Sequence, residues 1–170
     1  AGRPAGLPRG LGRAVPLARG AKRRHGAQGA VGRESVEGGV LFAGDSTGTV
    51  YQWDIGRRVL SHSWKAHEGS VWGMLMASFA LISGGLDGMV KLWDLRNTSK
   101  CVTSLKLENQ IEDFCFRKEQ LVVANGNAIT LVDIHESTAF EEMTSFYPFQ
   151  KPVSKVRYDS HRDRIIAGGL

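Results

Sequence analysis

Short runs of alternating hydrophobic and polar residues fill the sequence from residue 36 onward, and glycine-rich turns separate them. Residues 71–76, 80–83 and 89–93 are three such runs, and Gly84-Gly85-Leu86-Asp87-Gly88 divides the second from the third. Alternating runs of this length between glycine turns predict an antiparallel β-meander. One small meander cannot bury both of its faces, so the pattern requires neighbouring sheets of the same kind.

The same pattern returns with a period of about 40 residues. The segments that share it are Val71-x-x-Met74-x-Met76, Ile111-x-x-Phe114-x-Phe116 and Val153-x-x-Val156-x-Tyr158. Trp53-Asp54 and Trp93-Asp94 repeat at an offset of 40 residues, and His67 stands near the start of the best-preserved copy. A period of this length with an early His and a final Trp-Asp is typical of propeller blades, and at these residues the chain resembles the WD-repeat β-propeller family.

This resemblance implies an all-β fold, a partial β-propeller of about three blades, each a four-stranded antiparallel sheet. The blades are expected at about residues 36–64, 66–107 and 111–147, and a fourth begins within 153–170. We expect the first blade to lack its first strand and the chain to stop in mid-hairpin at Leu170. Residues 139–143 also fit a helical turn, but the repeat favours a strand there. Closed propellers have typically four to eight blades, so an incomplete ring is expected.

The resemblance also implies a hydrogen-bonded set of side chains in the second blade. By position these are His67, Ser83, Asp87 and Trp93. A carboxylate fixes the tautomer of an imidazole, and a hydroxyl links to an indole N–H, so the set would lock the loops between the strands. The alternative is a catalytic His67–Asp87 dyad, but no Ser or Cys nucleophile lies at a suitable spacing.

The other blades depart from this set. Ala43 and Thr47 stand at the Ser and Asp positions of the first blade, and Ala167 stands at the Ser position of the fourth. Val132 replaces the Trp of the third blade, whose turn is shortened to Asn125-Gly126, a two-residue hairpin signal. Packing must therefore dominate the stability of these blades.

In this family, the residues that flank the first core position of the innermost strand, and the residue before the turn Asp, often contact partner proteins. Here these positions are Ser46, Ser70, Trp72, Leu86, Gln110, Glu112, Pro152 and Ser154. Trp72 and Leu86 form a plausible apolar anchor, because buried Trp commonly dominates interface energy. The alternative for Trp72 is packing against a neighbouring blade.

Residues 1–34 have a different composition, dominated by Ala, Gly, Pro and Arg, with no aromatic residue and no apolar periodicity. Such a segment cannot bury enough surface to offset its ordering entropy, so we expect a disordered tail. Lys22-Arg23-Arg24 fits a weak nuclear import patch or, more simply, a solvated stretch of that tail. The folded part, residues 35–170, is then expected as one incomplete propeller.

The tail also explains the basic net charge. Residues 1–33 hold eight Lys or Arg and no acid, which leaves 14 basic and 17 acidic residues in the remainder. We therefore expect no basic face on the propeller and no specific nucleic-acid partner. No apolar run approaches the roughly 20 residues of a membrane span, so no membrane partner is expected either.

Candidate reactive groups are few. Cys101 and Cys115 have neither metal spacing nor an obvious disulfide pairing, so reduced thiols are expected. Gly44-x-x-x-Gly48 and Gly84-Gly85 are hairpin turns, since no Lys-Ser/Thr follows them as in a phosphate-binding loop. We predict a non-enzymatic protein without cofactor, metal or small-molecule substrate.

Within the family, the runs Leu41-Phe42-Ala43-Gly44-Asp45-Ser46, Ala66-His67-Glu68-Gly69-Ser70-Val71 and Ser83-Gly84-Gly85-x-Asp87 look most like the EMAP-like microtubule-associated proteins. That resemblance implies a protein-interaction scaffold that binds tubulin or microtubules in the cytoplasm, at the cytoskeleton. The alternative is a WD-repeat subunit of a nuclear or nucleolar RNA-processing complex, or of another multiprotein complex.

Overall fold

The computed structural model describes residues 35–37, 39–77, 80–97, 100–117, 120–134 and 139–169. The tail predicted at 1–34, with Lys22-Arg23-Arg24, lies outside the described residues. The described residues form fourteen strands and no helix, which confirms the all-β prediction.

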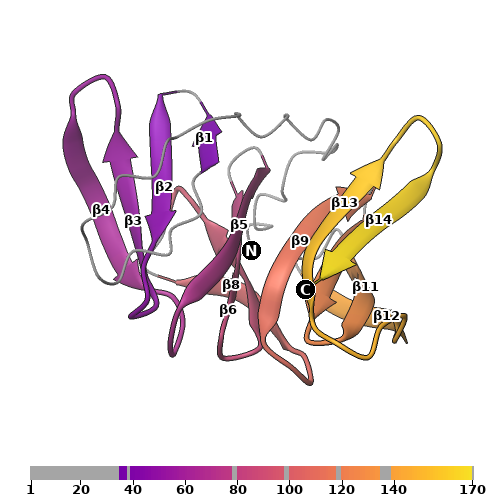
Figure 1. Cartoon of the computed structure of the whole chain (residues 1–170). Helices are drawn as coiled ribbons and strands as arrows, with labels where there is room; N and C mark the ends of the chain where they lie inside the picture. The colour runs from indigo at the N-terminus through magenta and orange to yellow at the C-terminus, as the bar shows by residue number, and fades with distance from the viewer. Residues whose placement is uncertain are drawn as a thin grey trace, which may run out of the picture.

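The strands follow one another in four antiparallel sheets, each a meander in chain order (Figure 1). The first sheet contains β1 (Ser35–Glu37), β2 (Val40–Gly44), β3 (Thr49–Asp54) and β4 (Val59–Lys65). The second contains β5 (Val71–Ala77), β6 (Ala80–Gly85), β7 (Met89–Asp94) and β8 (Cys101–Lys106). The third contains β9 (Ile111–Arg117), β10 (Gln120–Asn125), β11 (Ala128–Ile134) and β12 (Phe140–Phe146), and the fourth pairs β13 (Val153–Asp159) with β14 (Arg164–Gly169).

Two details of the predicted elements are decided by the strand pairing. The first sheet does have a first strand, because β1 pairs with β2 from Ser35↔Phe42 to Glu37↔Val40, so the expectation that it is missing is wrong. Residues 140–146 form the strand β12, which pairs with β11, so the strand assignment is confirmed over the helical turn.

The sheets stand side by side in an arc, with the first strand of each sheet on the inside (Figure 1). Inner strands touch in succession: β1 contacts β5, β5 contacts β9 and β9 contacts β13. This is the arrangement expected of consecutive propeller blades.

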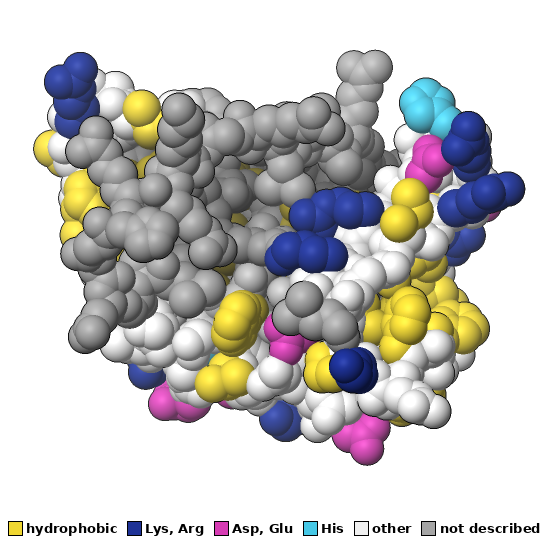
Figure 2. Space-filling model, in the orientation of Figure 1, with side chains coloured by type: hydrophobic (Ala, Val, Ile, Leu, Met, Phe, Trp, Pro, Cys, Tyr) yellow, Lys and Arg dark blue, Asp and Glu magenta, His cyan; other side chains and the backbone are white. Residues whose placement is uncertain are grey.

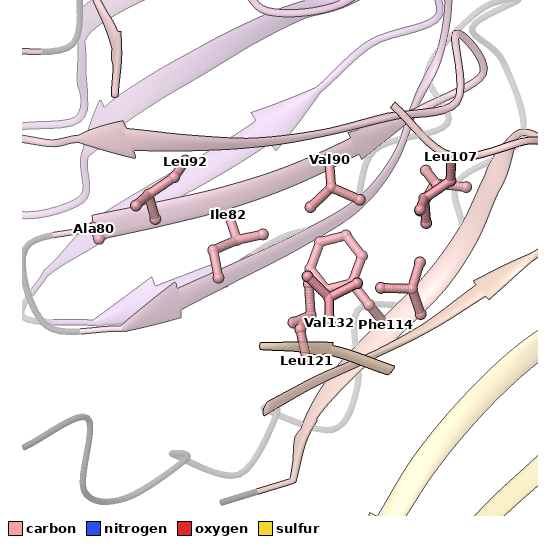
Figure 3. Packing of buried hydrophobic residues seen from close by; sticks show 10 residues of the cluster. Ala80, Ile82, Val90, Leu92, Leu107, Phe114, Leu121 and Val132 are labelled. Carbon is pink, nitrogen blue, oxygen red and sulfur yellow. The ribbon is translucent and has the colours of Figure 1, made fainter. Parts of the chain in front are cut away.

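The core lies between the sheets rather than within one of them. Leu81 points toward the first sheet and packs with Phe42 of that sheet and with Trp93 of its own sheet. Its neighbour Ile82 points the opposite way and packs with Leu121 of the third sheet (Figure 3). Successive side chains of a strand point to opposite faces, so one strand serves two interfaces. This explains why every residue of β6 is buried.

Glycine is needed where the hairpin turns approach the next sheet. Gly48 has φ +92°, and a Cβ there would stand 1.9 Å from the carbonyl oxygen of His67. The close approach allows the N–H of Ala66 to donate to the carbonyl of Gly48 at 2.8 Å. Gly88 repeats the arrangement one sheet later, where it accepts from the N–H of Leu107 at 2.9 Å. These bonds tie each turn to the chain segment that leaves its sheet.

Alternate connections of antiparallel strands lie at the same edge, so the loops form two rims. We call the lower edge in Figure 1 the lower rim, and it holds residues 45–48, 66–70, 86–88, 107–110, 126–127 and 147–152. The opposite edge, the upper rim, holds residues 39, 55–58, 95–97, 100, 139 and 160–163 among those described.

Candidate functional site

The polar set predicted in the second sheet comes from four segments: the loop at 66–70, strand β6, the turn at 86–88 and strand β7. The Nδ1 atom of His67 lies 2.9 Å from Oδ1 of Asp87, and its Nε2 atom lies 2.7 Å from Oγ of Ser83. The indole N–H of Trp93 donates to the same Oγ at 2.9 Å. Every group is satisfied when the Nδ1–H of a neutral His67 donates to Asp87 and the Ser83 hydroxyl donates to Nε2.

Burial decides the charge of this histidine. His67 is 1% exposed, and desolvation lowers its pKa below the usual value, although the carboxylate of Asp87 pulls in the other direction. Partial burial raises the pKa of Asp87, but hydrogen bonds from the N–H of Glu68 and from His67 outweigh it, and the net shift is downward. The pair is therefore a neutral imidazole beside a carboxylate at neutral pH.

The hydrogen bonds of this set hold two loops of the lower rim together. Asp87 accepts hydrogen bonds from the N–H of Glu68 at 3.0 Å and of Met89 at 3.1 Å. It thus joins the loop at 66–70 to the turn at 86–88. Ser83 is fully buried between His67 and Trp93, so the hydroxyl sits inside the sheet packing and not in an open cleft.

In the first sheet, where Thr47 stands at the position of the turn Asp, the carboxylate of Asp45 accepts the hydrogen bonds that hold the turn. Its Oδ1 accepts from the N–H of Thr47 at 2.9 Å and of Thr49 at 3.0 Å. The hydroxyl of Tyr51 donates to its Oδ2 at 2.9 Å. The signal was an Asp at the start of a glycine turn, where an Asx turn forms readily.

A buried ion pair between the third and fourth sheets was also missed. The carboxylate of Asp113 is fully buried, and Nη1 of Arg157 lies 2.7 Å from its Oδ2. The N–H of Val156 donates to the same oxygen at 3.3 Å. The two residues lie 44 positions apart in the sequence, so no local sequence pattern predicts that they form a pair.

Three of the predicted partner-binding residues meet on the lower rim, across the first and second sheets. The N–H of Leu86 donates to the carbonyl of Ser70 at 2.9 Å. The hydroxyl of Ser70 donates to the carbonyl of Ser46 at 3.3 Å. Leu86 is nevertheless 45% exposed, so a fixed backbone presents an open apolar side chain.

The other predicted residues are more scattered. The side chain of Gln110 is exposed and donates to the carboxylate of Glu112. Pro152 is exposed, and the hydroxyl of Ser154 donates to the carbonyl of Gly168 at 3.2 Å, within its own hairpin. Trp72 is half-buried, and its indole N–H is shielded without a hydrogen-bond partner. Leu86 is therefore the open member of the predicted anchor pair.

The sequence did not single out a group of exposed aromatic residues on the same rim. Phe146, Tyr147 and Phe149 are 52%, 59% and 42% exposed. The hydroxyl of Tyr147 donates to Glu108 at 3.3 Å, and the adjacent Leu107 binds the turn of Gly88. These two bonds link the loop of the aromatic group to the turn that carries Leu86, through residues 107–108.

Reactive groups are sparse in the part of the chain that the structure describes. No three His, Cys, Asp or Glu side chains gather there as metal ligands. Cys101 and Cys115 are free and half-buried, and desolvation with the nearby Asp113 raises the pKa of Cys115 to about 12. Among the same residues, none belongs to a helix with the length and hydropathy of a membrane crossing.

Comparison with known proteins supports the repeat at the second sheet. The family model described as WD domain, G-beta repeat matches residues 58–94, from β4 to the end of β7. Zinc finger CCCH domain-containing protein 62 of Arabidopsis thaliana is 33% identical over 86 residues, covering 47% of this chain and 20% of that protein. WD repeat-containing protein 3 homolog of Dictyostelium discoideum is 38% identical over 56 residues, covering 32% and 6%. The chain spans a fifth or less of the length of these relatives.

Solved structures show the propeller-like fold. The computationally designed Ika4 protein aligns with a TM-score of 0.69 at 20% identity, covering 88% of this chain and 98% of that one. The designed Ika8 protein gives 0.66 at 18%, covering 81% and 45%. A chain of the Mitotic Checkpoint Complex gives 0.65 at 15%, covering 71% and 41%. The predicted WD-repeat resemblance is therefore confirmed at residues 58–94, within a propeller-like fold.

Proposed function

We propose that this protein is a non-enzymatic interaction scaffold that binds partner proteins through its lower rim. The observation that carries the proposal is Leu86, which is 45% exposed on a turn whose backbone is fixed on both sides. Its own N–H binds Ser70, and the following Asp87 binds His67 and Glu68. A surface that is rigid before binding loses little conformational entropy on binding.

Further apolar side chains are exposed on the lower rim. Tyr147 and Phe149 lie on the same rim, and interface cores are enriched in aromatic residues. Glu68, Glu108 and Gln110 are exposed polar neighbours, so apolar anchors stand within a polar surround. Such a layout is typical of protein–protein interfaces, in which a few anchors contribute most of the binding energy.

For the partner, we propose tubulin in the form of microtubules, with a cytoplasmic location at the cytoskeleton. The support is the sequence resemblance of the runs around Asp45, His67 and Ser83 to EMAP-like proteins. The alternative is a nuclear complex, including RNA-processing assemblies, for which Lys22-Arg23-Arg24 is the local support.

The test is co-sedimentation of the full chain with polymerised tubulin, comparing wild type with Leu86→Asp. Burying a charge at an apolar anchor costs several kcal/mol, so the variant is expected to lower the sedimented fraction at least about fivefold. Val102→Asp is the matched control, because Val102 is a 39% exposed apolar residue of the same sheet, on β8 away from the rim.

Each outcome decides a separate claim. Wild-type protein that stays in the supernatant contradicts the microtubule assignment. In that case, proximity labelling in cells with wild type and Leu86→Asp tests the scaffold itself. Neighbours lost from the variant but kept with Val102→Asp support the lower rim, and an unchanged set of neighbours overturns it. Nuclear foci of the tagged protein favour the alternative complex.

A further inference from the structure

Basic residues gather in one segment of the propeller, contrary to the expectation from its net charge. Residues 151–164 hold five Lys or Arg and two Asp, whereas residues 35–150 hold nine Lys or Arg and 14 Asp or Glu. The charge averaged over the folded part therefore hides a local excess of positive charge. A local excess, rather than net charge, is what determines where an oppositely charged partner docks.

The basic residues of this segment lie along one strand and the hairpin that follows it. Lys155 and Arg157 lie on β13, the inner strand of the fourth sheet, and Arg162 and Arg164 lie at the turn and start of β14. Figure 2 shows Lys and Arg side chains gathered over β13 and over the hairpin that joins β13 to β14. We call these four residues the basic strip. It runs from the inside of the arc to the upper rim, away from Leu86.

The position of Arg157 in the basic strip is fixed by a buried carboxylate. Nη1 of Arg157 binds the buried carboxylate of Asp113 at 2.7 Å and also the carbonyl of Val156, yet 43% of the side chain remains exposed. Asp113 compensates its formal charge, so Arg157 contributes a fixed donor more than a net positive charge. Lys155, Arg162 and Arg164 are exposed and present further positively charged groups along the same path.

The length of the strip suggests its ligand. Strands rise about 3.3 Å per residue, so the path from Lys155 to the hairpin turn measures roughly 17 Å. About five residues of an extended peptide cover that distance. Carboxylates suit such a path, because Arg pairs with them in a bidentate, charge-assisted geometry.

We propose that the basic strip is a second docking surface, independent of the lower rim, for an extended acidic peptide of a partner protein. One feature favours a peptide over a nucleic acid. The ring of Tyr158 has the Arg117 guanidinium 5.9 Å from its centroid, so that face is not open to a stacked base.

The test uses the full chain and a fluorescein-labelled hexaglutamate peptide, with binding followed by fluorescence anisotropy. We expect hexaglutamate to bind and a labelled hexaglutamine to bind at least about tenfold more weakly. The double variant R162E/R164E is expected to weaken hexaglutamate binding by a similar factor. R57E/K100E is the matched control, because it reverses the same number of exposed charges on other loops and is expected to change affinity less than about twofold.

Three results would overturn the proposal. Equal binding of the two peptides means that charge recognition is absent. Equal weakening by R162E/R164E and R57E/K100E, or by neither, means that the attraction is diffuse or comes from the basic residues 1–33. Tighter binding of a labelled single-stranded polyuridine, lost in R162E/R164E, assigns the strip to nucleic acid. Leu86→Asp is expected to bind hexaglutamate as wild type does, so failure at one surface is distinguishable from failure at the other.

Discussion

At the scale of single residues, a few buried polar groups determine the geometry of the lower rim. His67, Ser83 and Trp93 satisfy one another inside the second sheet, and Asp87 carries the chain of bonds out to the turn. A buried donor or acceptor without a partner costs about 1–3 kcal/mol. The network is therefore stable only when it is complete, because removing one member leaves the buried polar groups of the others without hydrogen-bond partners.

Ser83→Ala tests this directly. The change leaves Nε2 of His67 and the indole N–H of Trp93 without their buried partner, so we expect a loss of about 2–4 kcal/mol in the free energy of unfolding. Ser104→Ala is the matched control, because Ser104 is exposed on β8 and its change is expected to cost less than about 0.5 kcal/mol. Urea denaturation followed by tryptophan fluorescence measures both. Equal midpoints for the two variants would contradict the network.

Acidification tests the charge state of His67. Its pKa is lower in the folded protein than in the unfolded chain, because burial disfavours the imidazolium. The stability gained from the neutral form is complete above the unfolded value of about 6.5 and is lost as pH falls through the folded pKa. The lowered pKa of Asp87 acts in the same direction at more acidic pH.

We therefore expect the melting temperature of the wild type to fall between pH 7.5 and pH 5, and to fall less in His67→Gln. His62→Gln, which changes an exposed histidine of β4, should retain the wild-type dependence. Differential scanning calorimetry at the two pH values measures the effect. An equal pH dependence in wild type and His67→Gln would show that His67 does not titrate with unfolding.

At the scale of elements, the sequence predicted the strands that recur in every repeat and missed the contacts that occur only once. Period-two alternation and glycine turns were enough to place strands such as β5 and β9, because strand pairing depends on those local signals. The Asp113–Arg157 pair was missed because its members belong to different sheets. The basic strip was missed because charge was counted over residues 34–170 as a whole. The bonds of Asp45 were missed because the family pattern directed attention to Thr47.

The glycine turns allow an element-scale prediction that separates backbone strain from contact. Gly39 and Gly48 both have positive φ, +82° and +92°, but an added Cβ meets nothing within 4 Å at Gly39 and the carbonyl oxygen of His67 at 1.9 Å at Gly48. Gly39→Ala should cost only the strain, about 1–2 kcal/mol. Gly48→Ala should cost clearly more, because the first sheet must move away from the loop that carries His67. Thermal unfolding of both variants measures the difference, and equal losses would contradict the close approach.

At the scale of the whole molecule, stability comes from interfaces between successive sheets. Leu81 and Ile82 serve two interfaces from one strand, so loosening one sheet weakens both of its neighbours. The two binding surfaces proposed here use opposite edges of this arc. The lower rim offers apolar anchors at Leu86 and Tyr147, and the basic strip leads to the upper rim. One partner protein could therefore be held at each edge without competition.

Asp113 provides the test of how one such interface is held. Asp113→Ala removes the buried acceptor of Arg157 and of the N–H of Val156, and breaking a buried ion pair by one partner costs about 3–5 kcal/mol. Asp94→Asn is the control, since it weakens the exposed pair with Arg96 and should cost no more than about 1 kcal/mol. Hydrogen exchange should become faster across β13 and β14 in Asp113→Ala, while β6 and β7 keep their protection, because the pair joins only the third and fourth sheets. Uniform acceleration in all sheets would mean that the arc unfolds as one unit and that Asp113 has no local role.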